Sequence, residues 1–228
     1  MTIKQTMTGS EIIVEVLAEQ GVETIFGYSG GAILPTYDAV FQYNEKHKNA
    51  MPLIVPANEQ GAGFMASGYS RATGKPGVVM VTSGPGATNT VTPVRDAMAD
   101  SIPMIVICGQ VNRSSIGSDA FQEAPITSVM GSVAKHVFLV TDEDKLAATI
   151  RAAFEISTSG RPGPVVVDIP KDIQTASIDL RFGSYLPGID SEFAETNKAT
   201  PYADILKDSA LERSINVVWR LWHGFGEL

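Results

Sequence analysis

This sequence cannot form an internal disulfide bond, because it contains a single cysteine, Cys108. That residue lies in the apolar run PMIVIC, which predicts a buried strand residue without a partner and favours a reducing cytoplasm. Basic charge is also scarce, since 17 Lys and Arg stand against 25 Asp and Glu, giving a formal net charge of −8. Such a field repels phosphate backbones and anionic lipid, so neither nucleic acid nor a membrane surface is an expected partner.

Long hydrophobic segments are missing as well. No uncharged apolar run approaches the roughly 20 residues that a bilayer-spanning helix needs. The opening stretch MTIKQTMTGSEIIVEVLAEQG has no basic end and spaces its apolar residues like one helix face, which argues against a secretory signal. We therefore expect a soluble cytoplasmic protein, whose 228 residues, 44% of them hydrophobic, suffice for one large core and a small appendage.

Several catalytic signatures are absent too. The histidines, His47, His136 and His223, have no cysteine or carboxylate at ligand spacing, so no metal site is expected and they are interpreted as surface or interface residues. No G-x-S-x-G elbow occurs, which leaves serine hydrolase chemistry without support. The stretch GYSRATGKP is not a P-loop, because its glycine spacing is wrong and Pro76 replaces the required Ser or Thr.

A regular alternation of helical and strand signals is what the sequence has instead. The strands are continuous apolar runs such as VVMVT, MIVIC and VVVDI, as expected when helices cover both faces of a parallel sheet. A helix capped by Ser10 and ended by Gly21 is followed by predicted strands at 24–27, 52–56, 77–82, 103–108, 135–140 and 164–169 and by predicted helices at 32–46, 59–73, 87–100, 124–131 and 143–158. The prediction is an α/β domain, a doubly wound, mostly parallel six-stranded sheet with helices on both faces.

The alternation stops soon after Lys171. Residues 176–203 combine glycine and proline with polar residues, show no clean period and are predicted to be a linker. Residues 204–228 begin like a helix, carry both tryptophans and differ in composition from everything before them. The expected organisation is one domain over 1–175, the linker, and a short atypical segment.

Ligands of open parallel sheets bind at the carboxyl ends of the strands, so the loops that follow strands are the places to search. Glu59 follows such a strand and opens a helix. By placement alone it is interpreted as a helix-start acid beside a good cap, Asn58, because both stabilise the amino end of a helix. The same helix contains Gly61, Gly63 and Gly68, which are poor helix formers but let another backbone approach closely. A helix-end role and a functional role therefore both stay open.

Two other turns could serve a ligand. Residues 83–89, SGPGATN, form a strand-to-helix turn where backbone N–H groups can meet an anion, but they lack the G-x-G-x-x-G spacing and a phosphate-binding lysine. A plain tight turn is the favoured interpretation. Arg161 opens the stretch RPGPV and is either an exposed arginine on a rigid turn or a ligand for a phosphate or anionic cofactor.

Five motifs, in order, carry a resemblance to a known family: FGYSGGAILPTYDA, NEQGAGFMASGYSRATGKPGVVMVTSGPGATN, DSIPMIVICGQV, IGSDAFQE and SGRPGPVVVDIPKDIQ. Over about residues 8–175 they resemble the N-terminal, pyrimidine-binding domain of the large catalytic subunit of acetolactate synthase (acetohydroxyacid synthase), a thiamine-diphosphate-dependent transferase. The stretches DAFQE and GRPGPV favour this family over its relatives. The resemblance implies the thiamine-diphosphate-binding fold.

The resemblance also implies roles for single residues. Glu59 becomes the catalytic residue that hydrogen-bonds N1′ of the cofactor's aminopyrimidine, which accounts for a carboxylate at a helix start beside small residues. The expected cofactor contacts are Glu59, Ser101, Gly84, Pro85, Gly86, Gln122 and, for FAD, Arg161. The expected substrate-channel residues are Gly30, Gly31, Ala32, Phe121, Gln122, Lys135 and Lys171. Asn58 stands where the family usually has histidine, and we expect it to remain a competent cap.

The implied reaction decarboxylates pyruvate and joins the product to a second pyruvate or to 2-oxobutyrate, in branched-chain amino acid biosynthesis. Mg²⁺ and FAD in the full-length enzyme, a homodimer or tetramer, and a small regulatory subunit are implied with it. Pyruvate oxidase, glyoxylate carboligase and a non-catalytic fragment that pairs with intact subunits stay as alternatives. The sequence has no Gly-Asp-Gly motif for Mg²⁺ and diphosphate, and LKDSALER resembles the start of a middle domain. We therefore expect a truncated subunit that is inactive alone and holds only the pyrimidine end of thiamine diphosphate.

Overall fold

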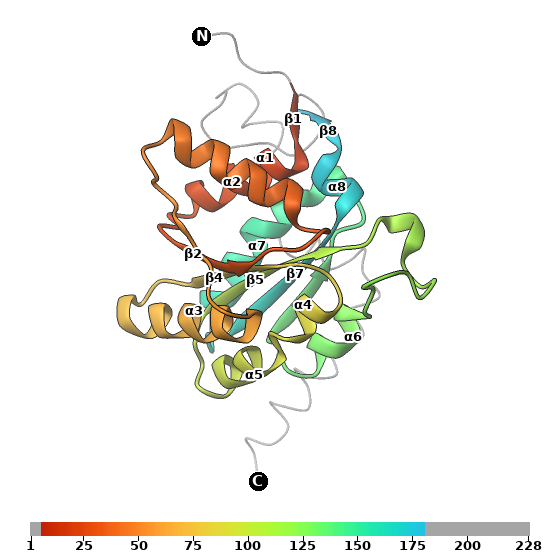
Figure 1. The fold of residues 1–228 in the computed structure, drawn as a ribbon. Helices are drawn as coiled ribbons and strands as arrows, with labels where there is room; N and C mark the ends of the chain where they lie inside the picture. The colour runs from red at the N-terminus through yellow and green to blue at the C-terminus, as the bar shows by residue number, and fades with distance from the viewer. Residues whose placement is uncertain (1–5, 181–228) are drawn as a thin grey trace. The chain divides into compact units, whose positions relative to one another are not determined.

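A parallel six-stranded sheet forms the centre of the protein. The computed structural model describes residues 6–180, and the strands of this sheet hydrogen-bond in the order β3–β2–β4–β5–β7–β6 (Figure 1). Every neighbouring pair is parallel, which confirms the predicted sheet. The strands are β2 (Ile25–Tyr28), β3 (Leu53–Ile54), β4 (Gly77–Val81), β5 (Met104–Gln110), β6 (His136–Leu139) and β7 (Pro164–Pro170).

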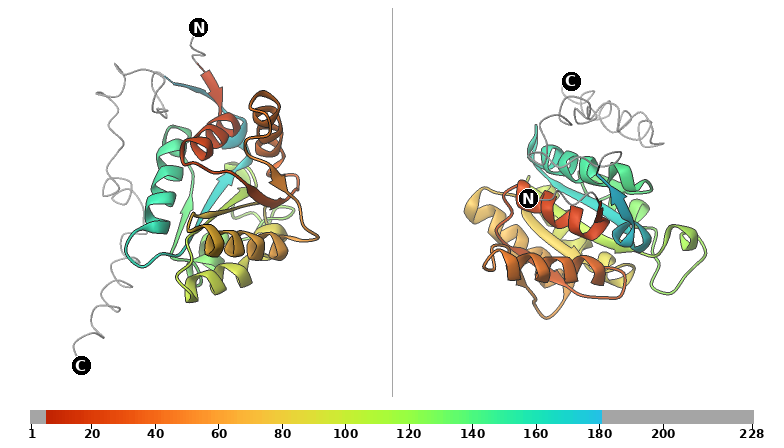
Figure 2. Two further views of the ribbon diagram at one scale, coloured as in Figure 1. Left: turned by 90° about the vertical axis from the view of Figure 1, so that its left-hand side faces the viewer. Right: turned by 90° about the horizontal axis from the view of Figure 1, so that it is seen from above.

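Helices cover both faces of this sheet, as the views from the front and the side show (Figures 1 and 2). One face carries α1 (Gly9–Glu19), α2 (Leu34–Lys46) and α7 (Leu146–Thr158), and the other carries α3 (Glu59–Thr73), α5 (Val91–Ala99) and α6 (Ile126–Gly131). Shorter elements are α4 (Pro85–Thr88), α8 (Lys171–Thr175) and the 3₁₀ turns η1 (Arg113–Ser115) and η2 (Glu143–Lys145). All residues of β4, β5 and β7 are buried, which explains why these strands are unbroken apolar runs.

The first helix begins earlier than expected. Thr8 is its N-cap, and its hydroxyl accepts from the backbone N–H of Glu11 while the Glu11 carboxylate accepts from the backbone N–H of Thr8. The prediction that Ser10 caps this helix is wrong, because the T-x-x-E pattern just before it forms a complete capping box. Ser10 lies inside α1, where its hydroxyl donates to the carbonyl of Gln174 at 2.9 Å.

A second sheet pairs β1 (Thr6–Thr8) with β8 (Ser177–Asp179) in antiparallel register. Strand β8 belongs to the range expected as a linker, 176–203, so the first residues of that range are part of the folded domain. Three-residue strands present too short an apolar pattern to be recognised in a sequence. The remainder of the expected linker and the atypical segment at 204–228 lie outside the described residues.

The helix predicted at 87–100 is in fact two helices, α4 and α5, separated at Asn89 and Thr90. Pro93 explains the break, because it has no N–H to donate to the carbonyl of Asn89, so a continuous helix is disfavoured here. Strand β3 has two residues rather than the predicted five, since prolines precede and follow it. The helix expected at 143–158 begins as the turn η2 before α7.

Helix α3, which Glu59 opens, packs closely against α5. A Cβ added at Gly63 would lie 2.3 Å from Pro93 Cγ, whereas a Cβ added at Gly68 would meet nothing within 4 Å. A close approach is therefore present at Gly63, where the ring of Pro93 and not another backbone makes it, and absent at Gly68. This contact fixes the helix that carries the candidate acid.

We expect Gly63→Ala to lower the free energy of unfolding by about 1–3 kcal/mol, because the added methyl group overpacks the contact with Pro93. Gly68→Ala is the matched control in the same helix, and it should be neutral or stabilising by up to about 1 kcal/mol. Urea unfolding of both variants, followed by circular dichroism, measures the difference. Equal stabilities would show that α3 and α5 do not touch at this point.

Candidate functional site

The loops at the carboxyl ends of β2 and β4 leave toward opposite faces of the sheet. Strand β2 continues into α2 and β4 continues into α4 and α5, although the two strands are hydrogen-bonded neighbours (Figure 1). Such a switch point opens a crevice at the strand ends, where α/β proteins bind their ligands. Strand β3 pairs with β2 on its other side, and Glu59 follows β3, so this acid belongs to the same edge.

Glu59 is the first residue of α3 and is 9% exposed. Asn58 caps the helix, since its side chain accepts from the Gly61 backbone N–H at 2.8 Å, and the expected cap is confirmed. The Glu59 carboxylate is turned toward the glycine-rich turn, where Oε2 accepts from Asn89 Nδ2 at 2.9 Å. The capping requirement of α3 is therefore met without consuming this carboxylate.

Thr82, which follows β4, is where the two loops of the crevice meet. A Cβ on Gly30 would lie 2.4 Å from Thr82 Cγ2, and a Cβ on Gly86 would lie 2.6 Å from the same atom. The Thr82 hydroxyl accepts from the Ala32 backbone N–H at 3.2 Å. The missing Cβ of Gly86 would also be 3.5 Å from Glu59 Oε1, an oxygen with no hydrogen-bond partner among residues 6–180. One carboxylate oxygen thus lies beside the backbone of Gly86.

Tyr37 of α2 is a second buried polar group close to Glu59. Its hydroxyl donates to the carbonyl of Met80 at 2.9 Å, and a Cβ on Gly27 would lie 2.3 Å from that hydroxyl. Burial, and after it the negative charge of Glu59, raises the pKa of Tyr37 above its ordinary value, so the phenol stays protonated. Sequence reasoning missed Tyr37 and Asn89, because their proximity to Glu59 arises across the fold and no local spacing signals it.

The glycine-rich turn also contacts the loop over residues 111–125, which joins β5 to α6. Gly84 has a φ of 50°, and a Cβ there would lie 2.3 Å from the carbonyl oxygen of Gln122. Gln122 has a φ of 57°, and the preceding Phe121 is 89% exposed. The structure thus brings Gln122 and the turn at Gly84 together.

Other expected site residues share this carboxyl edge. Gly31 is exposed, Pro85 is the exposed first residue of α4, and Lys171 is the exposed first residue of α8. The carbonyl of Ala32 accepts from Gln174 Nε2 at 2.8 Å, which joins the loop after β2 to α8.

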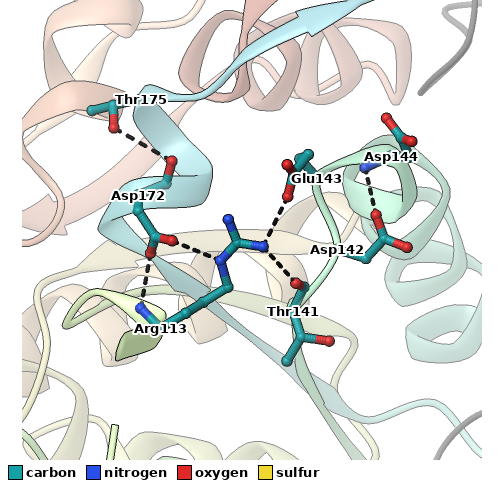
Figure 3. A network of polar contacts seen from close by, with 7 residues as sticks. All are labelled: Arg113, Thr141, Asp142, Glu143, Asp144, Asp172 and Thr175. Carbon is teal, nitrogen blue, oxygen red and sulfur yellow. Dashed lines mark hydrogen bonds and ion pairs between the residues drawn. The ribbon is translucent and has the colours of Figure 1, made fainter. Parts of the chain in front are cut away.

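Arg113 joins the loops that follow three neighbouring strands at this edge (Figure 3). Its backbone N–H and its Nε donate to the two carboxylate oxygens of Asp172 at 2.9 and 2.6 Å. One terminal nitrogen donates to the carbonyl of Thr141 and to Glu143 Oε2, both at 2.9 Å. Partial burial would raise the pKa of Asp172, but the bonds from Arg113 outweigh it and the net direction is downward. The start of the 111–125 loop is therefore anchored to the segments after β6 and β7.

Three expected site residues lie at the opposite, amino edge of the sheet. Ser101 precedes β5, Arg161 precedes β7 and Lys135 precedes β6, whereas Glu59 follows a strand. Arg161 donates from Nε to the Ser101 hydroxyl at 2.8 Å and from a terminal nitrogen to the carbonyls of Met98 and Ala99 at the end of α5. Within one chain the structure therefore does not bring Ser101 together with Glu59 or with the turn at 84–86.

Lys135 at that amino edge serves a helix end. Its ammonium group donates to the carbonyls of Ile156 and Ser159, the latter at 2.6 Å, at the carboxyl end of α7. Burial lowers the pKa of Lys135, while the two carbonyls and the helix dipole favour a cation at this position. Sequence reasoning missed this capping role, because the contact joins Lys135 to a helix end more than 20 residues further along the chain. The position of Lys135 at the start of a predicted strand does place it at the amino edge of the sheet.

Asp168 is a buried acid at the centre of β7, 1% exposed. Its Oδ2 accepts from Gln110 Nε2 at 2.9 Å, and its Oδ1 has no partner among the described residues. Burial raises the pKa of Asp168 to about 7, and the hydrogen bond from Gln110 opposes part of that rise. Gln110 Nε2 also donates to the carbonyl of Ala124 at 3.2 Å, so the pair holds the far end of the 111–125 loop.

One histidine is buried, although all of them are expected at the surface or at an interface. His47 is exposed and stacks on Tyr43, whereas His136 in β6 is 6% exposed and packs edge-on against Phe138. The interpretation of His136 as a surface or interface residue is wrong, because its side chain is buried within the domain. Burial lowers the pKa of His136 to about 4. His223 lies outside the described residues.

Residues 6–180 contain no group of three or more His, Cys, Asp or Glu side chains that could hold a metal ion. None of the helices between these limits has the length and apolar character needed to cross a bilayer.

Comparison with known proteins identifies similar chains. A family described as thiamine pyrophosphate enzyme, N-terminal TPP binding domain, matches residues 7–132. The mitochondrial acetolactate synthase catalytic subunit of Saccharomyces cerevisiae is 55% identical over 170 residues, 75% of this chain and 24% of that protein. The acetolactate synthase isozyme 2 large subunit of Escherichia coli is 50% identical over 174 residues, 76% of this chain and 31% of that protein. An acetolactate synthase of Mycobacterium bovis is 50% identical over 169 residues, 74% of this chain and 26% of that protein. The chain thus spans about a quarter to a third of the length of these relatives.

The buried Asp168 predicts a pH dependence of stability. Its pKa of about 7 in the folded protein lies above the ordinary value of 3.8, so between these values the folded protein binds a proton that the unfolded chain has released. The contribution of Asp168 to the free energy of unfolding should therefore fall as pH rises from about 4 to about 7, by up to about 4 kcal/mol, and level off above that. Burial of His136 lowers its pKa to about 4 and so contributes in the opposite direction between about pH 4 and its ordinary value of 6.5. Urea unfolding of the wild type and of Asp168→Asn at about pH 5 and about pH 8 isolates the Asp168 contribution as the difference between the two chains.

Asp168→Asn keeps the shape and an acceptor for Gln110 but cannot ionise, so its stability should lack the fall with rising pH that Asp168 contributes. Glu155→Gln removes a charge of the same sign from the exposed surface of α7 and should leave the difference in place. An unchanged pH difference in Asp168→Asn would contradict the assignment to this acid.

Proposed function

This chain belongs to the thiamine pyrophosphate enzymes, whose N-terminal TPP binding domain it carries, and we propose that it is the N-terminal part of an acetolactate synthase catalytic subunit. Identities of 50–55% to proteins of that name support the proposal. The structural observation that carries it is the buried carboxylate of Glu59, which lies beside the glycine-rich turn at Gly86, at the switch point of the sheet. The proposed reaction decarboxylates pyruvate and joins the product to a second 2-oxo acid, giving acetolactate or acetohydroxybutyrate for valine, leucine and isoleucine biosynthesis.

The described residues fit the pyrimidine end of the cofactor. A flat heterocycle needs a slot without side chains and a hydrogen-bonding group at its edge. At Gly86 the turn presents bare backbone next to the acid, since a Cβ there would lie 3.5 Å from Glu59 Oε1. Thiamine diphosphate, when bound, supplies the electron sink for decarboxylation and carbon–carbon bond formation.

Glu59 would hold N1′ of the aminopyrimidine through its Oε1 oxygen. Asn89 fixes the other carboxylate oxygen, so the side chain cannot rotate without breaking a 2.9 Å hydrogen bond. The protonated hydroxyl of Tyr37 donates its hydrogen bond to the carbonyl of Met80, so it does not donate to the Glu59 carboxylate. We assign Glu59 as the catalytic residue and Asn89 as the residue that orients it.

The remaining expected contacts are proposals of different kinds. Gly30, Gly31, Ala32, Phe121, Gln122 and Lys171 share the edge of Glu59, and we propose them for the substrate side. The pair Arg161–Ser101 and Lys135 lie at the amino edge, and we propose them for contact with FAD and with parts of the full-length enzyme other than this crevice. Mg²⁺ is proposed for the full-length enzyme, with no ligand assigned among residues 6–180.

The organisation of the whole enzyme is proposed with the function. We propose a domain over 1–175, a linker over 176–203 and the start of a middle domain at 204–228, in a homodimer or tetramer to which a small regulatory subunit could bind. A cytoplasmic location is proposed, although relatives named mitochondrial and chloroplastic exist in yeast and in Arabidopsis thaliana. The 228-residue chain alone is proposed to be inactive, because the diphosphate and Mg²⁺ sites of the family are not among its motifs.

A domain exchange tests the function directly. Residues 7–175 replace the matching segment of the Escherichia coli isozyme 2 large subunit, and the purified chimera is given pyruvate, thiamine diphosphate, Mg²⁺ and FAD. We expect acetolactate, measured by its conversion to acetoin, whereas the 228-residue chain alone should give none. A folded chimera that instead forms acetyl phosphate from pyruvate when phosphate and oxygen are supplied, or tartronate semialdehyde when glyoxylate is supplied, would favour the pyruvate oxidase or glyoxylate carboligase alternative.

Within the chimera, Glu59→Gln should lower turnover by about 10² to 10⁴, the usual effect of losing a positioned acid–base group. The substitution keeps the side-chain volume and leaves Asn58 to cap α3, so the fold should persist. Glu45→Gln, at an exposed position of α2, serves as the control and should retain activity. A near-normal rate in Glu59→Gln would remove this residue from the role assigned.

A further inference from the structure

The loop over residues 111–125 contains three positions with left-handed backbone. Gly117 has a φ of 85°, Asp119 a φ of 56° and Gln122 a φ of 57°. Two of these residues carry a Cβ, and such conformations persist only where the surrounding structure holds them. The centre of this loop must therefore contain a stabilising interaction.

The carboxylate of Glu123 provides that interaction. Its Oε1 accepts from the backbone N–H of Gly117 and its Oε2 from that of Ala120, the latter at 2.9 Å. The backbone N–H groups of Ser118 and Asp119 act on the same carboxylate. These hydrogen bonds, with that from Gly117 first, lower the pKa of Glu123 below its ordinary value. Successive N–H groups that converge on one anion form a backbone nest.

At the centre of the loop Ser118 also donates to the carbonyl of Ser115, and the Glu123 backbone N–H donates to the carbonyl of Ala120, but both are local turn contacts. The remaining contacts hold the ends of the loop. Arg113 binds Asp172 at the start, and Gln110 binds the carbonyl of Ala124 at the finish. Phe121 is 89% exposed, so packing of its own side chain does not fix its position within the described residues. The Gln122 carbonyl lies against Gly84, so its place depends on the path of the backbone.

We propose that Glu123 is a positioning residue: its carboxylate is the internal anion of the nest formed by residues 117–120, and it fixes where Phe121 and Gln122 stand. The bound segment runs from Gly117 to Glu123 and closes on itself, with Phe121 and Gln122 between the last N–H donor and the acceptor. The role of these two residues toward substrate rests on the proposed function, but the positioning itself does not.

Hydrogen–deuterium exchange of the 228-residue chain tests the proposal. Glu123→Ala should speed exchange of the Gly117 and Ala120 amides by about tenfold or more, because the carboxylate that protects them is lost, while the amides of β4, β5 and β7 stay protected. Cleavage by chymotrypsin after the exposed Phe121 should accelerate to a similar degree. Glu123→Gln keeps one acceptor oxygen without the charge and should fall between wild type and Glu123→Ala.

Chemical rescue separates an anion site from a general structural effect. Formate added to Glu123→Ala should slow the exchange at 117–120 again, whereas chloride at the same ionic strength and neutral formamide should not. A carboxylate of this size can accept from the same N–H groups, while the others cannot match its charge and geometry.

The glycine of the nest gives a second, independent variant with a matched control. Gly117→Ala and Gly131→Ala both place a methyl group where nothing lies within 4 Å, but only Gly117 has a left-handed φ. Gly117→Ala should loosen the loop as Glu123→Ala does, and adding it to Glu123→Ala should produce little further change. Gly131→Ala should leave the loop as in wild type.

Unchanged loop exchange and unchanged chymotryptic cleavage in a folded Glu123→Ala chain would overturn the proposal, as would equal rescue by chloride. If Glu123→Ala does not fold, Glu123→Gln and Gly117→Ala decide by the same measurements. These results do not depend on catalysis, so an inactive chimera would count against the proposed function and leave the positioning role intact.

Discussion

The backbones of two loops close on the side chain of Thr82, and they can do so because neither loop carries a Cβ at the point of contact. The loop after β2 approaches with Gly30 and with the N–H of Ala32, and the loop after β4 turns back with Gly86. Their strands are neighbours whose connections run to opposite faces, so this packing joins the two loops at the switch point of the sheet, next to Glu59. A side chain at either glycine would have to displace the threonine.

Two asparagines make separate hydrogen bonds around Glu59. Asn58 satisfies a backbone N–H at the start of α3, and Asn89 holds one oxygen of Glu59 from the neighbouring loop. An acid at a helix start is favoured by the dipole whatever else it does, so position alone does not reveal a function. The direction of the carboxylate, away from its own helix and toward a glycine turn, distinguishes a poised acid from an ordinary cap.

The large-scale pattern could be predicted because long apolar runs report burial on both faces of a sheet, as in β4, β5 and β7. The break between α4 and α5 was missed, since the proline that causes it lies inside an otherwise helical pattern. Asn89 and Tyr37 could not be found, because the hydrogen bond of Asn89 with Glu59 and the electrostatic effect of Glu59 on Tyr37 join segments that are distant in sequence. Ser101 shows the converse case: it precedes a strand, so the rule that ligands bind after strands already placed it at the other edge, while the resemblance suggested otherwise.

The pairing of β1 with β8 has a consequence for the domain as a unit. Residues 6–8 and 177–179 lie side by side, so the described fold begins and finishes at one place. A domain with adjoining ends can be cut out, reinserted or circularly permuted without stretching its backbone. Segments joined to either end of this domain would therefore leave it from the same two-stranded antiparallel sheet.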